Sequence, residues 1–193
     1  YLCKGIAGGN QNVEVLETSF YGDLANYKDW LLVQVLAALS DEFDRSSGYD
    51  AAIEYLKEKG VEYFNRETDS SKRYGNSITV DVTTAIDAAN FKRISVRGTV
   101  AEGNMMISRI NDFDKLYFEP TGTAVLFIYK DRPGVIGKIG QALASNNVNI
   151  DDMRNPHDLS QEYSLALMRV SQTVSNEVVV KIAKEIDALH SSS

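Results

Sequence analysis

The chain is poor in cysteine, histidine and proline, and it has no long hydrophobic run. The single cysteine, Cys3, excludes an intramolecular disulfide, and two histidines are too few for a Cys/His metal cluster. No apolar segment approaches the roughly 20 residues of a membrane span. We therefore expect a reduced, cytoplasmic setting, no metal and no membrane partner.

Basic side chains are also scarce, with 20 Lys and Arg against 27 Asp and Glu. The net charge of -7 disfavours nucleic acid as a partner, because a phosphate backbone is repelled by an acidic surface. A hydrophobic fraction of 44% and a charged fraction of 24% are typical of a globular protein. The 193 residues fit one large or two small domains and are too few for a two-domain nucleotide-dependent oxidoreductase. The first nine residues read as the end of a helix, so we expect a fragment that lacks its N-terminal part.

Catalytic motifs are missing. There is no Gly-x-Ser-x-Gly, His-Glu-x-x-His or phosphate loop. His157 lies in a predicted loop and His190 among the terminal residues, where we expect it to be exposed, so neither is predicted beside a nucleophile. Gly134, Gly137 and Gly140 are three residues apart, whereas a dinucleotide fingerprint needs Gly-x-Gly. We assign no catalytic residue, and we expect no cofactor in this chain.

The hydrophobic pattern predicts an α+β fold in two domains. In the first domain, residues 1–121, a strand over 13–20 precedes an apolar helix over 24–43, in which Trp30 faces the core, and a helix over 50–59. Short strands separated by polar loops follow. They are expected over residues 61–65, 76–84, 91–100, 105–111 and 115–119.

The segment Pro120-Thr121-Gly122 marks the expected boundary between the domains. Beyond it, residues 122–193 follow a β-α-β-β-α order, with helices over 133–145 and 176–189. This order, with short connections, is typical of a ferredoxin-like split β-α-β sandwich. The closing strand of that fold is expected to be nearly missing, because the last helix runs directly into three serines.

Asp131-Arg132-Pro133-Gly134 combines several features of an amino-acid site. Pro133 is expected at the first helical position, and Gly134 lets a ligand approach the backbone. Free N–H groups at a helix start suit an α-carboxylate, while Asp131 can pair with an ammonium and Asn149 offers an amide. The alternative, in which Asp131 only caps the helix and Asn149 is a polar residue at a strand edge, stays open.

Two segments of the second domain, Val125–Leu143 and Asn147–Met153, resemble the ACT regulatory domain of D-3-phosphoglycerate dehydrogenase. Upstream segments resemble the allosteric-substrate-binding domain that precedes ACT in the long form of that enzyme. These segments are Val13–Tyr21, Tyr74–Thr84, Ser95–Val100 and Arg109–Asn111.

The resemblance implies a regulatory region that senses L-serine, or a similar small amino acid, at an interface between ACT domains of a homodimer or homotetramer. Ligand contacts would fall on Tyr129, Asp131 and Asn149, with the carboxylate held by the backbone of Gly134 and Val135. The catalytic domains that bind NAD would precede this region.

The resemblance also implies an anion or effector site in the first domain, for which Arg109 and Lys115 are the candidates. The main alternative function is the β subunit of an iron–sulfur L-serine dehydratase, which joins a similar domain to ACT. A ferredoxin-like module that binds nucleic acid would need basic and aromatic residues on its sheet, and the net charge argues against it.

Overall fold

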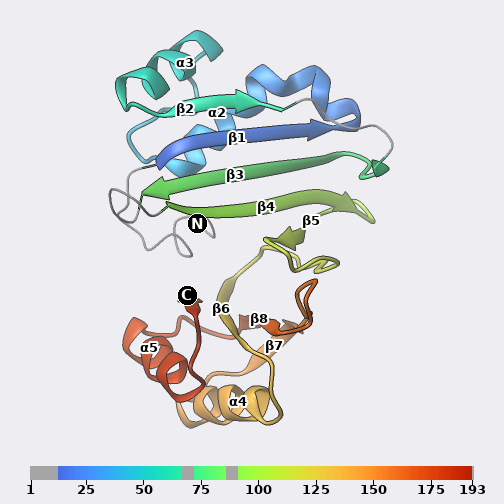
Figure 1. The fold of residues 1–193 in the computed structure, drawn as a ribbon, viewed down its shortest axis with the longest axis vertical. Coiled ribbons are helices and arrows are strands. Elements are labelled where there is room, and N and C mark those ends of the chain that lie inside the picture. Colours follow the sequence, from blue (N-terminus) through green and yellow to red (C-terminus); the bar gives the residue numbers. More distant parts are fainter. Residues whose placement is uncertain (1–12, 67–71, 86–90, 193) are drawn as a thin grey trace. The chain divides into compact units, whose positions relative to one another are not determined.

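The computed structural model describes residues 13–66, 72–85 and 91–192, so the helix end predicted in the first nine residues lies outside them (Figure 1). The chain divides into two compact units, Tyr1–Met105 and Met106–Ser193. Its described residues form two sheets and four α-helices, a mixed α/β architecture. The predicted domain boundary between residues 121 and 122 stays a prediction.

The first unit is built on a sheet in the order β2-β1-β3-β4-β5. Strands β1 and β2 are parallel, whereas β3 is antiparallel to both β1 and β4. Its elements are β1 (Val13–Tyr21), the 3-10 helix η1 (Gly22–Tyr27), α2 (Lys28–Leu39), α3 (Tyr49–Glu58), β2 (Glu62–Asn65), β3 (Ser77–Ala85) and β4 (Phe91–Ala101). Strand β5 (Asn104–Ile110) spans the division between the units.

The two faces of this sheet differ in chemistry. Leu16, Val82 and Ile94 are neighbours across three strands, and all are buried. On the other face, Glu17 lies opposite Asp81, and Glu17 forms ion pairs with two arginines of the same unit. Because side chains alternate along a strand, one face is apolar and the other polar.

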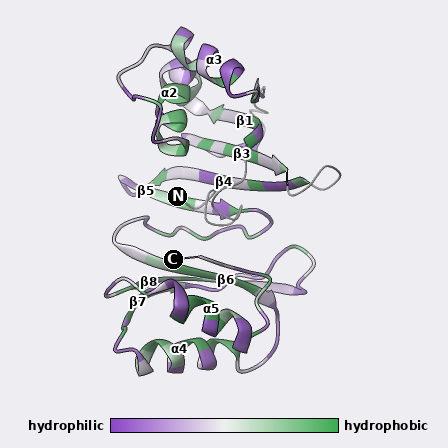
Figure 2. Ribbon diagram, turned by 90° about the vertical axis from the view of Figure 1, so that its left-hand side faces the viewer, coloured by the Kyte–Doolittle hydropathy of each residue, from purple (hydrophilic) through white to green (hydrophobic). Residues whose placement is uncertain are grey.

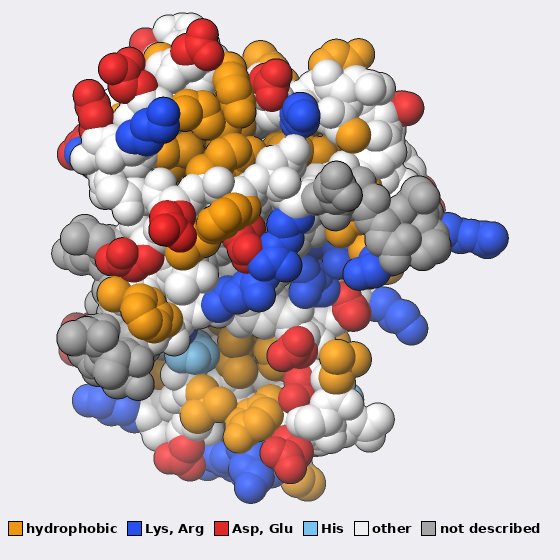
Figure 3. Space-filling model, turned by 45° about the horizontal axis from the view of Figure 1, so that its top comes forward, with side chains coloured by type: hydrophobic (Ala, Val, Ile, Leu, Met, Phe, Trp, Pro, Cys, Tyr) orange, Lys and Arg blue, Asp and Glu red, His pale blue; other side chains and the backbone are white. Residues whose placement is uncertain are grey.

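Helix α2 differs from its prediction over 24–43. Its first part is the 3-10 helix η1, and the α-helix stops at Leu39 because Ser40 is extended and its N–H bonds to the Leu36 carbonyl. Trp30 is 62% exposed rather than buried, because α2 is apolar around its circumference and only one side meets the core. Figure 3 shows hydrophobic side chains at the surface of this unit.

The second unit is a four-stranded antiparallel sheet in the order β7-β8-β6-β9. Its further elements are β6 (Thr123–Lys130), α4 (Val135–Ser145), β7 (Ile150–Arg154), β8 (Tyr163–Val170), α5 (Asn176–Glu185) and β9 (His190–Ser192). This order is consistent with the ferredoxin-like fold that the sequence predicts. The closing strand is present as β9, paired with β6, so the expectation that it is nearly missing was wrong.

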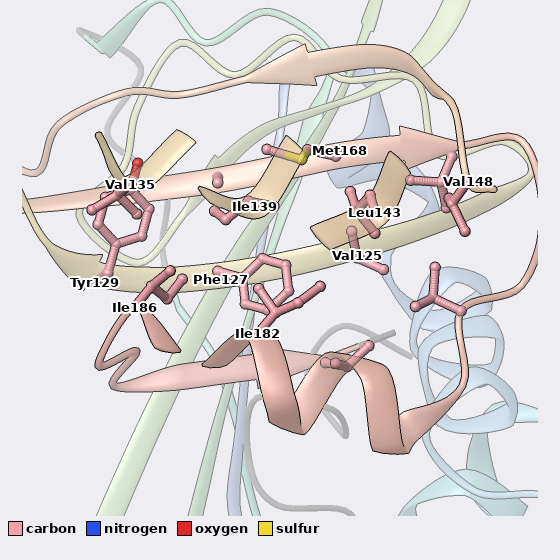
Figure 4. Close-up of a cluster of buried hydrophobic side chains, with 14 residues drawn as sticks. Val125, Phe127, Tyr129, Val135, Ile139, Leu143, Val148, Met168, Ile182 and Ile186 are labelled. Carbon is pink, nitrogen blue, oxygen red and sulfur yellow. The ribbon is translucent and has the colours of Figure 1, made fainter. Parts of the chain in front are cut away.

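One hydrophobic cluster joins β6, β8, α4 and α5 on one face of this sheet (Figure 4). Phe127 and Ile139 lie at its centre with no exposed surface. Along both helices, hydrophobic residues alternate with hydrophilic ones, as expected of helices that cover a sheet (Figure 2). The spacing of the apolar residues alone was therefore enough to predict this core.

The segment before β6 does not form the strand predicted over 115–119. Within the described residues it makes only an isolated bridge between Ile107 and Phe118, and Leu116 and Phe118 are buried. The guanidinium of Arg154 donates to the carbonyl oxygen of Leu116 at 2.8 Å and fastens the segment to β7. None of the helices in the described ranges is long and apolar enough to cross a membrane.

The core of the second unit makes a testable prediction about stability. Ile139→Ala removes a fully buried side chain and should lower the free energy of unfolding by about 2–5 kcal/mol. Val180→Ala, on the outer side of α5 where the side chain is 40% exposed, should change it by less than about 0.5 kcal/mol. Urea denaturation followed by circular dichroism measures both, and equal effects would contradict this core.

Candidate functional site

The turn between β6 and α4 carries the predicted site. Helix α4 begins at Val135, and Gly134 is its N-cap residue with φ of 88°. Pro133 therefore lies before the N-cap, and its predicted place at the first helical position was wrong. The left-handed conformation requires a glycine at position 134, and nothing lies within 4 Å of the position a Cβ would take. The helix start is thus open on this side.

The N-terminus of α4 has no side-chain cap among the described residues. Asp131, which could have been that cap, instead accepts a hydrogen bond at Oδ1 from the Ser164 hydroxyl at 2.8 Å. Its side chain is 41% exposed. A half-exposed carboxylate therefore stands beside uncapped N–H groups, a combination suited to a ligand with both an ammonium and a carboxylate.

Tyr129 lies two residues before Asp131 and is 1% exposed. Its ring belongs to the hydrophobic cluster, and its hydroxyl accepts a hydrogen bond from Asn155 Nδ2 at 2.9 Å. Burial raises the pKa of this hydroxyl, although its hydrogen bonds to Asn155 and Ser164 act in the opposite direction. The predicted contact of Tyr129 with a ligand stays a prediction.

Asn149 lies at the other end of the sheet. It precedes β7, and its backbone N–H bonds to the Ser171 hydroxyl, just beyond the end of β8. Asp131 lies beside the opposite end, where its N–H donates to the Glu162 carbonyl. Seven residue steps along β8 separate these ends, and at about 3.4 Å per residue they are about 24 Å apart.

The close-up view supports this separation. Tyr129 and Val135 lie at one end of the hydrophobic cluster and Val148, the residue before Asn149, at the other (Figure 4). The structure therefore brings Asp131, Gly134 and Val135 together and does not bring Asn149 to them within one chain. The Asn149 amide instead donates to the Asp151 carboxylate at 3.0 Å.

The candidate anion residues, Arg109 and Lys115, lie on the two arms of a hairpin-like turn in which the Leu116 N–H donates to the Ser108 carbonyl. Arg109 donates to the carbonyl oxygen of Asn111 at 3.0 Å, and Lys115 is exposed with φ of 59°. The proposed anion site stays a prediction.

Sequence reasoning missed three residues around Asp131. Ser164 is fully buried, Asn155 binds the Tyr129 hydroxyl, and His157 Nδ1 lies 3.1 Å from Ser164 Oγ. A signal was available for Ser164, because it is a polar residue in register with the apolar residues that point toward the helices. For Asn155 and His157 there was none, since both lie in the connection between β7 and β8.

His157 lies in the connection between β7 and β8, as predicted, but it forms an isolated bridge with Ser164 and so lies beside a hydroxyl. His190 was expected to be exposed but is partly buried in β9, where it pairs with Ile128.

The three spaced glycines are not a dinucleotide-binding motif. Gly137 and Gly140 lie inside α4, so the three spaced glycines form no loop that could cradle a pyrophosphate. The described residues also contain no group of three or more His, Cys, Asp or Glu side chains placed to hold a metal ion.

With the geometry established, comparison with known proteins agrees with the predicted resemblance. Residues 123–154, which include β6, α4, β7 and the turn at Asp131, match the ACT domain family. The match thus covers Asp131, Gly134, Val135 and Asn149.

Several relatives are D-3-phosphoglycerate dehydrogenases. The one from Synechocystis sp. is 25% identical over 187 residues, which is 95% of this chain and 32% of the relative. The one from Mycobacterium tuberculosis is 27% identical over 175 residues, 82% of this chain and 33% of the relative. The Bacillus subtilis enzyme is 34% identical over 99 residues, 51% of this chain and 18% of the relative.

This chain therefore spans about a third or less of the relatives it matches. The similarity extends through the first unit as well, since the Synechocystis match covers nearly the whole chain. The resemblance to the regulatory region of D-3-phosphoglycerate dehydrogenase is confirmed.

Two glycines test the backbone at the site. Gly134→Ala places a Cβ in a left-handed conformation and should destabilise the protein by about 1 kcal/mol. Gly137→Ala, three residues along in α4 where a Cβ has open space, should stabilise it by about 0.5–1 kcal/mol. Thermal denaturation of the two variants measures the difference, and the same sign for both would contradict the left-handed N-cap.

Proposed function

We propose that this chain is the amino-acid-sensing regulatory region of a D-3-phosphoglycerate dehydrogenase, an enzyme of L-serine biosynthesis. In this proposal an allosteric-substrate-binding-like domain, residues 1–121, precedes a ferredoxin-like ACT domain, residues 122–193. L-serine acts as the feedback inhibitor and binds between two ACT domains. The regulatory region has no catalytic residues of its own, and NAD binds to other domains of the parent enzyme.

The separation of Asp131 from Asn149 carries the proposal. One chain holds each half of the predicted site at opposite ends of its sheet, so a complete site needs a second copy. Strand β7 lies at the edge of the sheet and leads directly from Asn149. An edge strand can hydrogen-bond to a strand of another molecule, and this supports a homodimer with β7 paired to its own copy.

A two-fold axis relates the two β7 strands in an antiparallel pair. With the axis at Asp152, the central residue of β7, Asn149 of the partner subunit lies opposite Asn155. Asn155 donates a hydrogen bond to the Tyr129 hydroxyl. Tyr129 pairs with Ser164 across the strands, and the Ser164 hydroxyl binds Asp131. This pairing therefore carries the partner's Asn149 toward the end of the sheet where Asp131 lies.

Each part of an amino acid then meets a suitable group. The Asp131 carboxylate pairs with the ammonium, and the uncapped N–H groups from Gly134 and Val135 bind the α-carboxylate. Asn149 of the partner subunit provides both a donor and an acceptor for the remaining polar groups of the ligand. A ligand held by two subunits stabilises their association, which is the basis of its regulatory effect.

The relatives favour the dehydrogenase over the alternative, the β subunit of an iron–sulfur L-serine dehydratase, since those reported above are all D-3-phosphoglycerate dehydrogenases. The parent enzyme would be a cytoplasmic oxidoreductase. Arg109 and Lys115 are proposed to hold an anionic effector.

Binding of L-serine is the direct test. Calorimetric titration of the wild-type chain should release heat that fits one site per subunit, and Asp131→Ala should abolish it by removing the partner of the ammonium. Asp131 is half-exposed, but its loss removes the acceptor of the buried Ser164 hydroxyl, so the free energy of unfolding should fall by about 1–3 kcal/mol while the variant stays folded. A folded wild-type dimer that gives no heat at millimolar L-serine would overturn the proposal.

Mixing two inactive variants tests whether the site is shared between subunits. Asp131→Ala and Asn149→Ala should each bind no L-serine alone. Refolded together, they should regain binding, because each mixed dimer has one site with Asp131 from one subunit and Asn149 from the other. As the control, the double variant Asp131→Ala/Asn149→Ala refolded with either single variant should not regain L-serine binding, because no dimer then has a complete site. Mixed dimers that bind no L-serine would mean that the two residues do not share a site across the two-fold axis, and would overturn the shared site.

The pairing of β7 can be tested through charge. With the axis at Asp152, Met153 lies opposite the partner's Asp151, so Met153→Asp creates two symmetry-related pairs of like charges. Like charges opposite each other destabilise a pair of strands, and the dimer dissociation constant should rise about tenfold. Val180→Asp, a similarly exposed position on α5, should leave it unchanged. Sedimentation equilibrium measures both constants, and an equal effect of the two substitutions would exclude this edge.

A further inference from the structure

Ser164 ties three elements of the second unit together around the Asp131 carboxylate. It is fully buried, and its hydroxyl donates to Asp131 Oδ1 at 2.8 Å. The Ser164 hydroxyl oxygen also lies 3.1 Å from His157 Nδ1. Asp131 follows β6, Ser164 is in β8, and His157 lies in the connection that precedes β8. The three side chains therefore form a linked cluster that comes from three separate segments.

The directions of these hydrogen bonds follow from the single proton of the hydroxyl. A serine hydroxyl donates once and can accept twice. Because its proton goes to Asp131, the bond with His157 must use a proton on Nδ1 of the imidazole. This ring nitrogen lies 3.9 Å from Asp131 Oδ2, beyond hydrogen-bond distance. The hydrogen bonds thus run in series, from His157 Nδ1–H to Ser164 Oγ and from the Ser164 hydroxyl to Asp131 Oδ1, and Oδ2 has no direct donor from this cluster.

This arrangement is unlike a catalytic triad, although it contains the same three residue types. A nucleophilic serine gives its proton to the histidine, which acts as a base. Here the serine proton goes to the carboxylate, and the serine has no exposed surface. The cluster therefore orients a carboxylate rather than activating a hydroxyl.

We propose that Ser164 and His157 are positioning residues for ligand binding at Asp131. Ser164 holds Oδ1, His157 fixes the Ser164 hydroxyl through Nδ1–H, and Oδ2 is thereby aimed at the ligand ammonium. The inference rests on the proposed function, because it assigns to these two residues the orientation of the group that binds an amino acid.

The burial of Ser164 explains how such a group can be precise. Ser164 is the cross-strand neighbour of Tyr129, so the strand register rather than a loop places its hydroxyl. A carboxylate held at one oxygen loses little freedom when a ligand binds, and the affinity of the ligand increases accordingly. His157, whose side chain is 52% exposed, can be changed without disturbing the core.

The first test is the tautomer of His157, which does not depend on a ligand. Nitrogen-15 chemical shifts of the imidazole in the wild-type chain should show Nδ1 protonated, at a pH where the ring is neutral. In Ser164→Ala this preference should disappear. A wild-type His157 with the proton only on Nε2 would mean that Ser164 donates to the histidine, and would overturn the inference.

The second test compares ligands with and without an ammonium. Ser164→Ala should weaken L-serine binding about tenfold or more, as expected for a lost hydrogen bond to a charged group. Binding of 3-hydroxypropionate, which is L-serine without its ammonium, should change less than about twofold, because it has no ammonium for Asp131 to bind. Equal losses for both ligands would indicate general damage to the site instead of positioning of Asp131.

His157 provides the matched pair of variants. His157→Asn keeps an N–H near the position of Nδ1 and should retain L-serine affinity within about twofold, whereas His157→Val should weaken it severalfold. Equal affinity of the two would overturn the role of His157. If the wild-type chain binds no amino acid, the proposed function fails and this inference with it; if it binds and Ser164→Ala binds equally well, only this inference fails.

Discussion

The antiparallel register between β6 and β8 is the constraint on which the rest of the second unit depends. It sets Tyr129 opposite Ser164 and places both side chains on the face covered by α4 and α5. A slip by one residue would turn the Ser164 hydroxyl to the other face and remove it from Asp131. The core and the site therefore depend on the same pairing, since Phe127 and Met168 fill the cluster through the same alternation.

The same register explains why one chain forms only half of the proposed site. Strands β6 and β8 run the full length of the sheet, so the two connections at their ends are held apart. Asp131 and the start of α4 are at one end, and Asn149 is at the other. The sheet keeps this distance because strands resist bending in their own plane. A ligand that contacts both ends must bind between molecules, and its binding is then linked thermodynamically to assembly.

Binding between copies has a direct consequence for regulation. A ligand shifts an equilibrium only by its difference in affinity for the two states. A site divided between two chains gives that difference without any change within a chain, because neither isolated copy presents both halves. The activity of an enzyme joined to such a region would respond to the ligand through the arrangement of its subunits. The hydrogen bond from Ser164 fixes the orientation of the Asp131 carboxylate, so this side chain loses little conformational entropy when a ligand binds.

Much of the second unit was predictable from the sequence. Apolar residues with helical spacing, such as Ile139 and Ile182, identified the helices that cover the sheet, and the turn at Asp131–Gly134 was correctly singled out as the segment leading into α4. In the first unit, the end of α2 at Leu39 was not predictable. Ser40, Asp41 and Glu42 could equally form an exposed turn of helix before Phe43, and only the extended backbone at Ser40 ends the helix.

By itself, the sequence determined most of the element types, the apolar faces of the second unit and the resemblance to a regulatory region, because hydrophobic periodicity and local motifs are properties of neighbouring residues. Only the tertiary structure decided which polar groups meet. Ser164 reaches Asp131 across 33 positions of the chain, and His157 reaches the Ser164 hydroxyl from a connection without a motif. Such contacts follow from strand pairing, a long-range property that no local pattern contains. The separation of Asp131 from Asn149 arises in the same way.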